Sequence, residues 1–400
     1  MACPPQTSSR HKPHHRSVRV YTHHPIPFAS HLFFISHSPH PPTNSNLSGA
    51  SLDHLPDVFS PLTALTKLVL TSNALRDLPP SIAHLTNLQA LLLNNNAVVA
   101  LPIPLLHLAS LRQLWLNLNP IASIPPSISQ LSSNLEWLDL SECARLTALP
   151  VEVAALPSLQ RLDLHSCKIE YLPDSISSLK RLDHLSLHSN GLKELTPGVG
   201  GCTGLTWLSL NSNALTHLPP QIGQLTNLIR LSLHINQITS LPNEIGNLVH
   251  LEALSLHSNN LKSLPPEMGN LKECARLSLY QNRELKHIPD CVGGMTSLKE
   301  VWAYECGLMD VSPALSQLTG LQKLWLDRNH LISIPRELGA LTELKELYLD
   351  QNPELTEVPE EVLALPHAAI YIEGTGVVVA EEGGIGAVGV PPSSGGPAYQ

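Results

Sequence analysis

One segment of the sequence has the glycine spacing of a dinucleotide-binding loop. Gly384-Ile-Gly-Ala-Val-Gly389 fits G-x-G-x-x-G and follows the apolar run Val377-Val-Val379. A dinucleotide fold needs a helix after the glycines, a second strand and an acidic residue about 20 positions further on. The eleven residues after Gly389 are instead rich in proline, serine and glycine. We therefore interpret residues 374–400 as a flexible, glycine-rich tail.

Histidines recur in the middle of the chain, where they could bind a metal ion: His165, His184, His188, His234 and His257. Neighbouring imidazoles can bind Zn²⁺, yet no carboxylate or thiolate completes a ligand set here. We expect no metal site and interpret this region as a solvated polar face. It also carries a row of serines with Arg161, Arg230 and Arg276.

The motifs of common enzyme classes are missing from the sequence. It contains no Gly-Lys dipeptide for a phosphate-binding loop, no H-E-x-x-H, no kinase H-R-D and no C-x-x-C. With no catalytic constellation in view, we predict that the chain is not an enzyme and uses no cofactor.

The charge of the chain argues against a nucleic-acid partner. The formal net charge is −9, and all 33 acidic residues lie after residue 52. Phosphate backbones are bound by clustered lysine and arginine, so the acidic body of this chain argues against nucleic-acid binding. We predict a protein partner and no nucleic acid.

A leucine pattern at a fixed period organises most of the chain. The pattern L-x-x-L-x-L-x-x-N-x-L-x-x-L-P-x-x-I-x-x-L-x-x recurs thirteen times with a spacing of 23 or 24 residues. The repeats open at Leu65, Leu88, Leu111, Leu135, Leu159, Leu182, Leu205, Leu228, Leu251, Cys274, Leu298, Leu321 and Leu344. A period of this length is typical of a solenoid, in which each repeat packs only on its neighbours.

Each part of the repeat predicts a particular structural element. The opening L-x-L alternates as a half-buried strand does, and the proline that follows in most repeats ends the extended segment and favours a helical or 3-10 return. The ninth position is asparagine in ten repeats and Cys143, Cys167 or Cys306 in the others. A buried asparagine can donate to and accept from backbone groups where the chain leaves the strand. We expect the three cysteines to be structural.

The pattern predicts an α/β solenoid of horseshoe shape. A parallel β-sheet should line its concave side, and short helical or 3-10 segments its convex side. We assign residues 42–373 to this domain, with a partial first repeat and a degenerate last strand near Ile370-Tyr-Ile372.

The 23-residue L-P-x-x-I-x-x-L form resembles the intracellular Ras-group leucine-rich-repeat family, which includes Ras-scaffold proteins and a plant Ras-group-related subgroup. The resemblance covers residues 42–373 and implies a cytosolic signalling scaffold, with small GTPases or phosphatase complexes as typical partners. The tail beginning Gly374-Thr-Gly-Val-Val lacks the Gly-Val-Tyr-Trp signature of the plant subgroup.

Residues 1–41 precede the repeats and are rich in proline and histidine. We interpret them as a disordered extension, with an organelle transit peptide as the main alternative and a secretory signal around residues 26–35 as another. No apolar run is long enough to span a membrane, and no paired cysteines flank the repeats. We therefore expect a monomer in the cytoplasm.

Aromatic residues gather at repeat positions 3, 5, 7 and 8, which we place on the concave face. Trp302, Trp325 and Tyr348 occupy position 5 of consecutive repeats, so we expect a flat aromatic surface there. Around it lie Tyr280, Tyr304, Glu300, Glu305, Asp327, Asp350 and Glu346, with Lys323 as a lone base. An aromatic centre with an acidic rim suits a partner that presents apolar side chains among Lys and Arg. Strand propensity of Trp and Tyr is the structural alternative.

These observations predict a non-enzymatic scaffold for protein–protein interaction in intracellular signal transduction, linked to small GTPases. The binding site should comprise Trp302, Trp325, Tyr348, Tyr280, Tyr304, Glu300, Asp327 and Asp350. The alternative function is an immune-type recognition module for a foreign or self protein.

Overall fold

The computed structural model describes residues 18–19, 42–131 and 133–377. The glycine motif at 384–389 and most of the N-terminal extension lie outside these residues. The two described residues of the extension, Val18 and Arg19, pair as a strand with the first repeat. At the other end, Gly376 donates its backbone N–H to the Leu355 carbonyl, so the segment that begins at Gly374 still contacts the last repeat.

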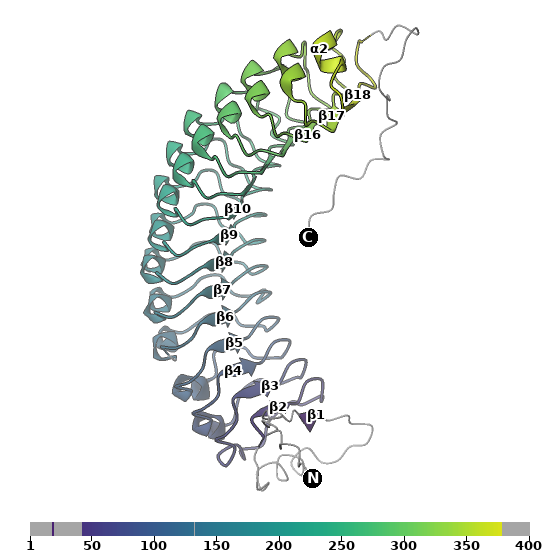
Figure 1. The fold of residues 1–400 in the computed structure, drawn as a ribbon. Helices are drawn as coiled ribbons and strands as arrows, with labels where there is room; N and C mark the ends of the chain where they lie inside the picture. The colour runs from purple at the N-terminus through teal and green to yellow at the C-terminus, as the bar shows by residue number, and fades with distance from the viewer. Residues whose placement is uncertain (1–17, 20–41, 132, 378–400) are drawn as a thin grey trace, which may run out of the picture.

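The repeats stack into a curved array, with one short strand in each turn and 3-10 segments along the outer edge (Figure 1). The strands are β1 Val18–Arg19, β2 Asn44–Asn46, β3 Lys67–Val69, β4 Ala90–Leu92, β5 Gln113–Trp115, β6 Trp137–Asp139, β7 Arg161–Asp163, β8 His184–Ser186, β9 Trp207–Ser209, β10 Arg230–Ser232, β11 Ala253–Ser255, β12 Arg276–Ser278, β13 His287–Ile288, β14 Glu300–Trp302, β15 Asp310–Val311, β16 Lys323–Trp325, β17 Glu346–Tyr348 and β18 Ala369–Tyr371. Within the described residues, sixteen of these strands form one parallel sheet in chain order, while β13 pairs only with β15. The predicted horseshoe fold is confirmed.

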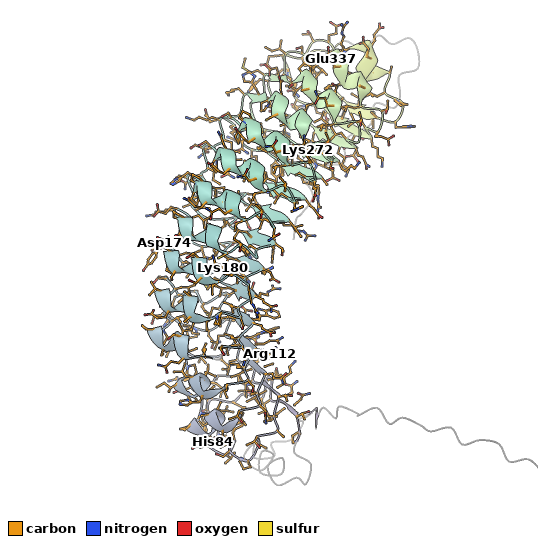
Figure 2. The ribbon with its side chains drawn as sticks, turned by 60° about the vertical axis from the view of Figure 1, so that its left-hand side comes forward. His84, Arg112, Asp174, Lys180, Lys272 and Glu337 are labelled. Atoms are coloured by element: carbon orange, nitrogen blue, oxygen red, sulfur yellow. The ribbon has the colours of Figure 1, made fainter. Side chains whose placement is uncertain are left out.

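The return segments are short 3-10 helices that mostly follow a proline: η1 Pro80–His84, η2 Ile103–His107, η3 Pro126–Gln130, η4 Val151–Ala155, η5 Asp174–Ser178, η6 Pro197–Gly201, η7 Pro220–Gln224, η8 Asn243–Asn247, η9 Pro266–Asn270, η10 Asp290–Gly294, η11 Pro313–Gln317 and η12 Arg336–Ala340. The last repeat has α2, Glu360–Leu363, instead. Asp174, the first residue of η5, lies at the outer edge in Figure 2. No helix among the described residues is long and apolar enough to cross a membrane.

The leucines of the repeat form one continuous core between the sheet and the 3-10 segments. Leu208, Leu231 and Leu254 face each other on β9, β10 and β11, and each is almost completely buried. The glycines of the return segments allow neighbouring turns to approach closely. A Cβ on Gly246 would lie 2.3 Å from the Glu267 carbonyl oxygen, so a larger residue would push the two turns apart.

The asparagine at position 9, a position that we call the slot, joins each repeat to the one before it. Asn213 Oδ1 accepts the Leu192 backbone N–H at 3.1 Å, and its Nδ2 donates to the carbonyls of Leu187 at 3.0 Å and Leu210 at 2.9 Å. All ten asparagines at this position repeat this arrangement. Because these backbone groups are shielded from water, the side chain replaces hydrogen bonds that the solvent cannot supply.

Two of the three cysteines at position 9, Cys167 and Cys306, keep only the donor half of this arrangement. Cys167 Sγ lies 3.2 Å from the Leu140 carbonyl, and Cys306 Sγ lies 3.1 Å from that of Leu279. Both follow a repeat with an inserted residue, in which the amide that would need an asparagine acceptor bonds within its own turn. Leu146 N–H donates to Cys143 O at 2.8 Å, and Leu285 N–H to Asn282 O at 2.9 Å. The insertion thus removes the need for asparagine in the next repeat.

Position 8 has a left-handed backbone in every repeat, with φ between 53° and 59° for non-glycine residues. This position, which we had placed on the concave face, lies at the edge of that face and forms the turn that leads into the asparagine. Serine occupies it in five of the thirteen repeats and asparagine in one, and asparagine tolerates this conformation well. Ile235 has φ 55° and an exposed fraction of 51%, so a β-branched side chain stands here without being buried.

We expect Asn213→Ala to lower the free energy of unfolding by about 1–3 kcal/mol, because buried backbone groups lose their partners. Chemical denaturation of the full chain measures this value. Asn211→Ala is the matched control, since Asn211 lies on the same turn and its side chain accepts, among the described residues, only the Ser209 hydroxyl. Equal stability of Asn213→Ala and wild type would contradict the assigned role of the slot.

We expect Ile235→Asn to raise the free energy of unfolding by about 1 kcal/mol, because left-handed backbone costs a β-branched residue about 1–2 kcal/mol and costs asparagine less. Val249→Asn is the control. It removes another exposed β-branched residue, one whose φ is not positive. If both variants change the urea midpoint equally, solvent exposure and not backbone strain determines the effect.

Candidate functional site

Position 5 brings the predicted aromatic residues together on neighbouring strands. The register places Trp302 beside Trp325 and Trp325 beside Tyr348, and β18 adds Tyr371 beside Tyr348. The predicted adjacency is therefore confirmed. Tyr371 extends the set by one member that the sequence analysis did not include, although its position in the degenerate last strand could have shown it.

The aromatic rings do not form the flat surface that we expected. Trp302 and Trp325 are tilted by 47° with ring centroids 6.1 Å apart, and Trp325 meets Tyr348 edge-on at 5.2 Å. Trp302 is buried, with only 6% of its surface exposed, whereas Trp325 and Tyr348 are half-buried. Edge-to-face packing is favoured by the charge distribution of aromatic rings. Trp325 and Tyr348 are thus the members of this set that a partner can reach.

A second column of stacked rings runs along position 7. Tyr304 stacks on Tyr280 at 4.4 Å, Tyr280 on His257 at 4.1 Å, and His257 on His234 at 4.3 Å. We had separated an aromatic C-terminal patch from a polar histidine region. The column crosses that boundary, because an imidazole and a phenol ring at one repeat position stack equally well.

The acidic rim is partly neutralised by bases. Glu300 lies 3.8 Å from Lys323, and Glu305 lies 2.9 Å from the guanidinium of Arg328. Lys323 is therefore not the lone base that we expected, because Arg328 at position 8 reaches the same surface. Glu346 is also engaged, since its Oε2 accepts the Trp325 indole N–H at 3.2 Å.

Asp327 and Asp350 are acidic groups at position 7, and Oδ2 of Asp327 lies 4.0 Å from Nε of Arg328. Burial raises the pKa of Asp327 to about 6, with Asp350 and Glu305 contributing and Arg328 opposing. Burial also raises the pKa of Asp350, which accepts the backbone N–H of Glu373 at 2.8 Å. A cation from a partner would relieve the cost of holding these carboxylates so close together.

The N-terminal half of the concave face has its charges paired internally. Asp163 is buried and accepts the Trp137 indole N–H at 2.9 Å and the Arg161 Nε–H at 2.7 Å. The Arg161 guanidinium lies 4.6 Å from the Trp137 ring centre, and the His184 ring packs on Trp207 at 3.5 Å. The charges of Asp163 and Arg161 are thus paired within the network, although Nε2 of His184 is buried without a hydrogen-bond partner among the described residues.

Burial lowers the pKa of four histidines of the concave face: His184, His188, His234 and His257. Burial, with the charge of Arg161, lowers the pKa of His184 to about 4, and burial, with His234 beside it, lowers that of His257 to about 3. The pKa values of His188 and His234 are lowered for the same main reason. Among the described residues, no three His, Cys, Asp or Glu side chains are placed to hold a metal ion.

The middle of the concave face is hollowed, which the sequence analysis missed. A cavity of about 530 Å³ has the serines of position 5 as its floor and ends at Trp207 and Trp302. Arg230 and Arg276 line one side, and histidines of position 7 line the other. The sequence signal was the run of serines at position 5, which begins one repeat before that of Trp207 and ends one repeat before that of Trp302.

Comparison with known proteins agrees with this architecture. Residues 133–192 match the family described as leucine rich repeat, and residues 220–331 match the leucine-rich repeat region. A leucine-rich-repeat protein of Leptospira interrogans is similar, with a TM-score of 0.71 and 32% identity over 88% of this chain and 94% of that one. No curated protein sequence matches the chain.

Two further solved structures share the fold at lower identity. An internalin from Listeria monocytogenes has a TM-score of 0.64 and 24% identity, covering 76% of this chain and 85% of that one. A plant peptide hormone receptor, solved in complex with its peptide, has a TM-score of 0.60 and 24% identity, covering 83% of this chain and 67% of that one.

The fold and the ladder of slot residues define a repeat solenoid with a continuous concave surface. With the 32% identical relative, they establish that the chain belongs to the leucine-rich-repeat proteins. Proteins of this family generally act as scaffolds for protein–protein interaction and are typically not enzymes.

We expect His257→Phe to weaken the loss of stability at acid pH. A histidine with a lowered folded pKa gives stability that is present above its unfolded pKa of about 6.5 and is lost as the pH falls toward the folded value. Phenylalanine keeps a ring between His234 and Tyr280 but removes the proton site. The variant should therefore lose less stability between pH 7 and pH 5 than wild type, by at most about 1.4 kcal/mol per pH unit.

Urea midpoints at the two pH values measure this difference. Asp327, whose pKa is raised, acts in the opposite direction in both proteins, so the comparison between them isolates His257. His107→Phe, an exposed ring on the convex side, is the control. Identical pH dependence of His257→Phe and wild type would show that the stacked histidine takes up protons freely in the folded state.

Proposed function

We propose that this protein is a scaffold in intracellular signal transduction that binds a small GTPase, or a complex containing one, through the C-terminal part of its concave face. The C-terminal concave surface comprises Trp302, Trp325, Tyr348, Tyr280, Tyr304, Glu300, Asp327 and Asp350. In this proposal the protein acts as a monomer in the cytoplasm.

The observation that carries the proposal is the half-buried aromatic pair at the centre of this surface. Trp325 and Tyr348 lie on adjacent strands and are held in place by their neighbours, so binding would order them little further. Aromatic side chains fixed in this way are typical anchors of protein interfaces, because they contribute a large contact area at a small entropic cost. Strand propensity alone would not place two carboxylates with raised pKa beside them.

The charge of the surface supports a basic segment as the part of the partner that docks. Asp327 and Asp350 follow each other at position 7, and the bases Lys323 and Arg328 pair mainly with Glu300 and Glu305. A Lys or Arg of the partner would therefore meet carboxylates whose mutual repulsion it relieves.

The cysteines support a reducing compartment. The six described cysteines are free, and five of them are buried. Burial raises the pKa of the Cys143 and Cys202 thiols to about 11, so the reactive thiolate is disfavoured. The link to small GTPases rests on the resemblance of the L-P-x-x-I-x-x-L repeat to the Ras-group family.

We expect Trp325→Ala to reduce affinity for the main partner by about 30- to 1000-fold, the usual effect of truncating a central aromatic anchor. Tagged full-length protein would capture partners from cytosol loaded with either GDP or a non-hydrolysable GTP analogue, with quantitative mass spectrometry as the readout. A small GTPase or its complex should be retained by wild type and by Trp325→Phe, and lost with Trp325→Ala.

Tyr171→Ala is the matched control, since this exposed tyrosine lies off the concave columns. Capture without any small GTPase would contradict the GTPase link. Undiminished capture by Trp325→Ala, together with loss in Arg230→Gln, would move the binding surface to the central hollow.

We expect Asp327→Lys to slow association with the captured partner and to weaken its dependence on salt, because a carboxylate that attracts a basic segment becomes a repelling ammonium. Surface plasmon resonance at two ionic strengths measures both quantities. An unchanged association rate would show that charge at this position does not guide binding.

A further inference from the structure

The central hollow carries two guanidinium groups that form no ion pair among the described residues, although Glu300 lies beside Arg276 on the next strand, β14. Arg230 and Arg276 are exposed, line the cavity, and have neither an ion pair nor a hydrogen bond among the described residues. Two of the three other bases at the same repeat position are paired, Arg161 with Asp163 and Lys323 with Glu300, whereas Lys67 on β3 is exposed and lies far from the hollow. No carboxylate lines the hollow, although the chain as a whole has a net charge of −9. The hollow is thus a local site for an anion.

The spacing of the two arginines suits a single anionic group. They occupy β10 and β12, with Ala253 between them on β11 in the same register. Strands lie about 4.8 Å apart, so the two Cα atoms are separated by about 10 Å. Ala253 and both arginines line the cavity, and the small side chain of Ala253 leaves a notch between the two arginines. Two guanidinium groups that converge on one point can bind a group carrying two negative charges.

The floor of the hollow adds hydrogen-bonding groups that lack partners. Ser278 is 3% exposed, and its hydroxyl has no partner among the described residues. The Nδ1 atom of His234 is shielded and unpartnered in the same way. Leaving buried polar atoms unpaired costs free energy, which a ligand with several acceptor oxygens would recover. The lowered pKa of His234 and of His257 leaves the two arginines as the source of positive charge.

From this arrangement we propose that the hollow between Trp207 and Trp302 binds a phosphorylated serine or threonine side chain of a partner protein, with Arg230 and Arg276 on the phosphoryl oxygens. A phosphoryl group carries nearly two negative charges and has three terminal oxygens, which match two guanidinium groups and the serine hydroxyls. A carboxylate has two oxygens and a single charge, which one arginine satisfies.

A protein is the source that fits best. The cavity volume of about 530 Å³ exceeds that of one phosphoryl group and leaves room for neighbouring side chains against the two tryptophans. A nucleic acid would bring many phosphates to a face that has only two free arginines here and an acidic surface beyond Trp302. The site adjoins the C-terminal concave surface at Trp302, which belongs to both, but the anchors Trp325 and Tyr348 do not line the cavity.

The test uses the full chain and a fluorescent pool of nine-residue peptides with a central phosphoserine and random flanking residues. The same pool with an unmodified serine is the reference, and fluorescence anisotropy gives the affinities. We expect the phosphorylated pool to bind at least about tenfold more tightly than the serine pool, since each charge-assisted hydrogen bond contributes a factor of about ten or more. Raising the salt concentration should narrow this difference.

Variants at the notch locate the site. Arg230→Gln and Arg276→Gln should each reduce affinity for the phosphorylated pool by about tenfold, and the double variant should bind both pools equally. Ala253→Leu keeps both charges but fills the notch, so it should also abolish the preference. Lys67→Gln is the matched control, because it removes one exposed positive charge at the same repeat position on β3. It should leave binding unchanged, and so should Trp325→Ala.

Equal binding of the two pools by wild type would overturn the proposal, as would a preference that survives in the double arginine variant. Free phosphoserine or inorganic phosphate binding as tightly as the peptide pool would also overturn it, by showing that the site takes a small anion and not a protein segment. A loss of phosphopeptide binding in Trp325→Ala would mean that the two surfaces are one site. The capture of a GTPase tests only the C-terminal concave surface. Its failure would not affect the phosphopeptide measurement.

Discussion

The backbone hydrogen bonds that the position-9 side chain completes are the constraint on which the rest of the structure depends. Each turn of the solenoid leaves a strand through a left-handed residue, which leaves backbone N–H and C=O groups inside the array. Asparagine satisfies groups of its own repeat and of the preceding one, as Asn236 does with the Leu215 amide and the Leu210 and Leu233 carbonyls. Because every repeat is fixed to its neighbour in this way, positions 3, 5 and 7 form straight columns. The columns in turn make the concave face a surface whose side chains are positioned before any partner arrives.

The sequence was sufficient to predict the fold because the repeat applies the same constraints in every turn. The leucine spacing predicts the strand, the asparagine predicts the ladder, and the proline predicts the return on the convex side. Local exceptions were harder to read. The link between the insertion before Cys167 or Cys306 and the missing asparagine acceptor appears only when the Leu146 and Leu285 amides are traced to their partners. The left-handed backbone at position 8 was also missed, because residues as different as Ser212 and Ile235 share it.

The sequence predicted which residues lie on the concave face, but not how their side chains are tilted and buried there. Periodicity places Trp302, Trp325 and Tyr348 in one column, yet it says nothing of ring tilt, and so the burial of Trp302 was not foreseen. Which charged side chains remain unpaired depends on contacts between repeats, and the aligned repeat sequences do not show these contacts. Arg161 is paired with Asp163, whereas Arg230 and Arg276 are not. The result is a face with three parts: an internally satisfied N-terminal network, a cationic hollow, and an aromatic surface with residual acidity.

The central claim is that the slot hydrogen bonds couple the repeats into one rigid array. Hydrogen–deuterium exchange of the wild-type chain, resolved to single amides by NMR, tests it most directly. The Leu192, Leu215 and Ile238 amides, each bonded to a slot asparagine, should exchange as slowly as the strand amides of β9 to β11, because both open only when several repeats unfold together. Exchange at these three amides that is orders of magnitude faster than in the adjoining strands would contradict the account. It would show that the turns open independently of the sheet.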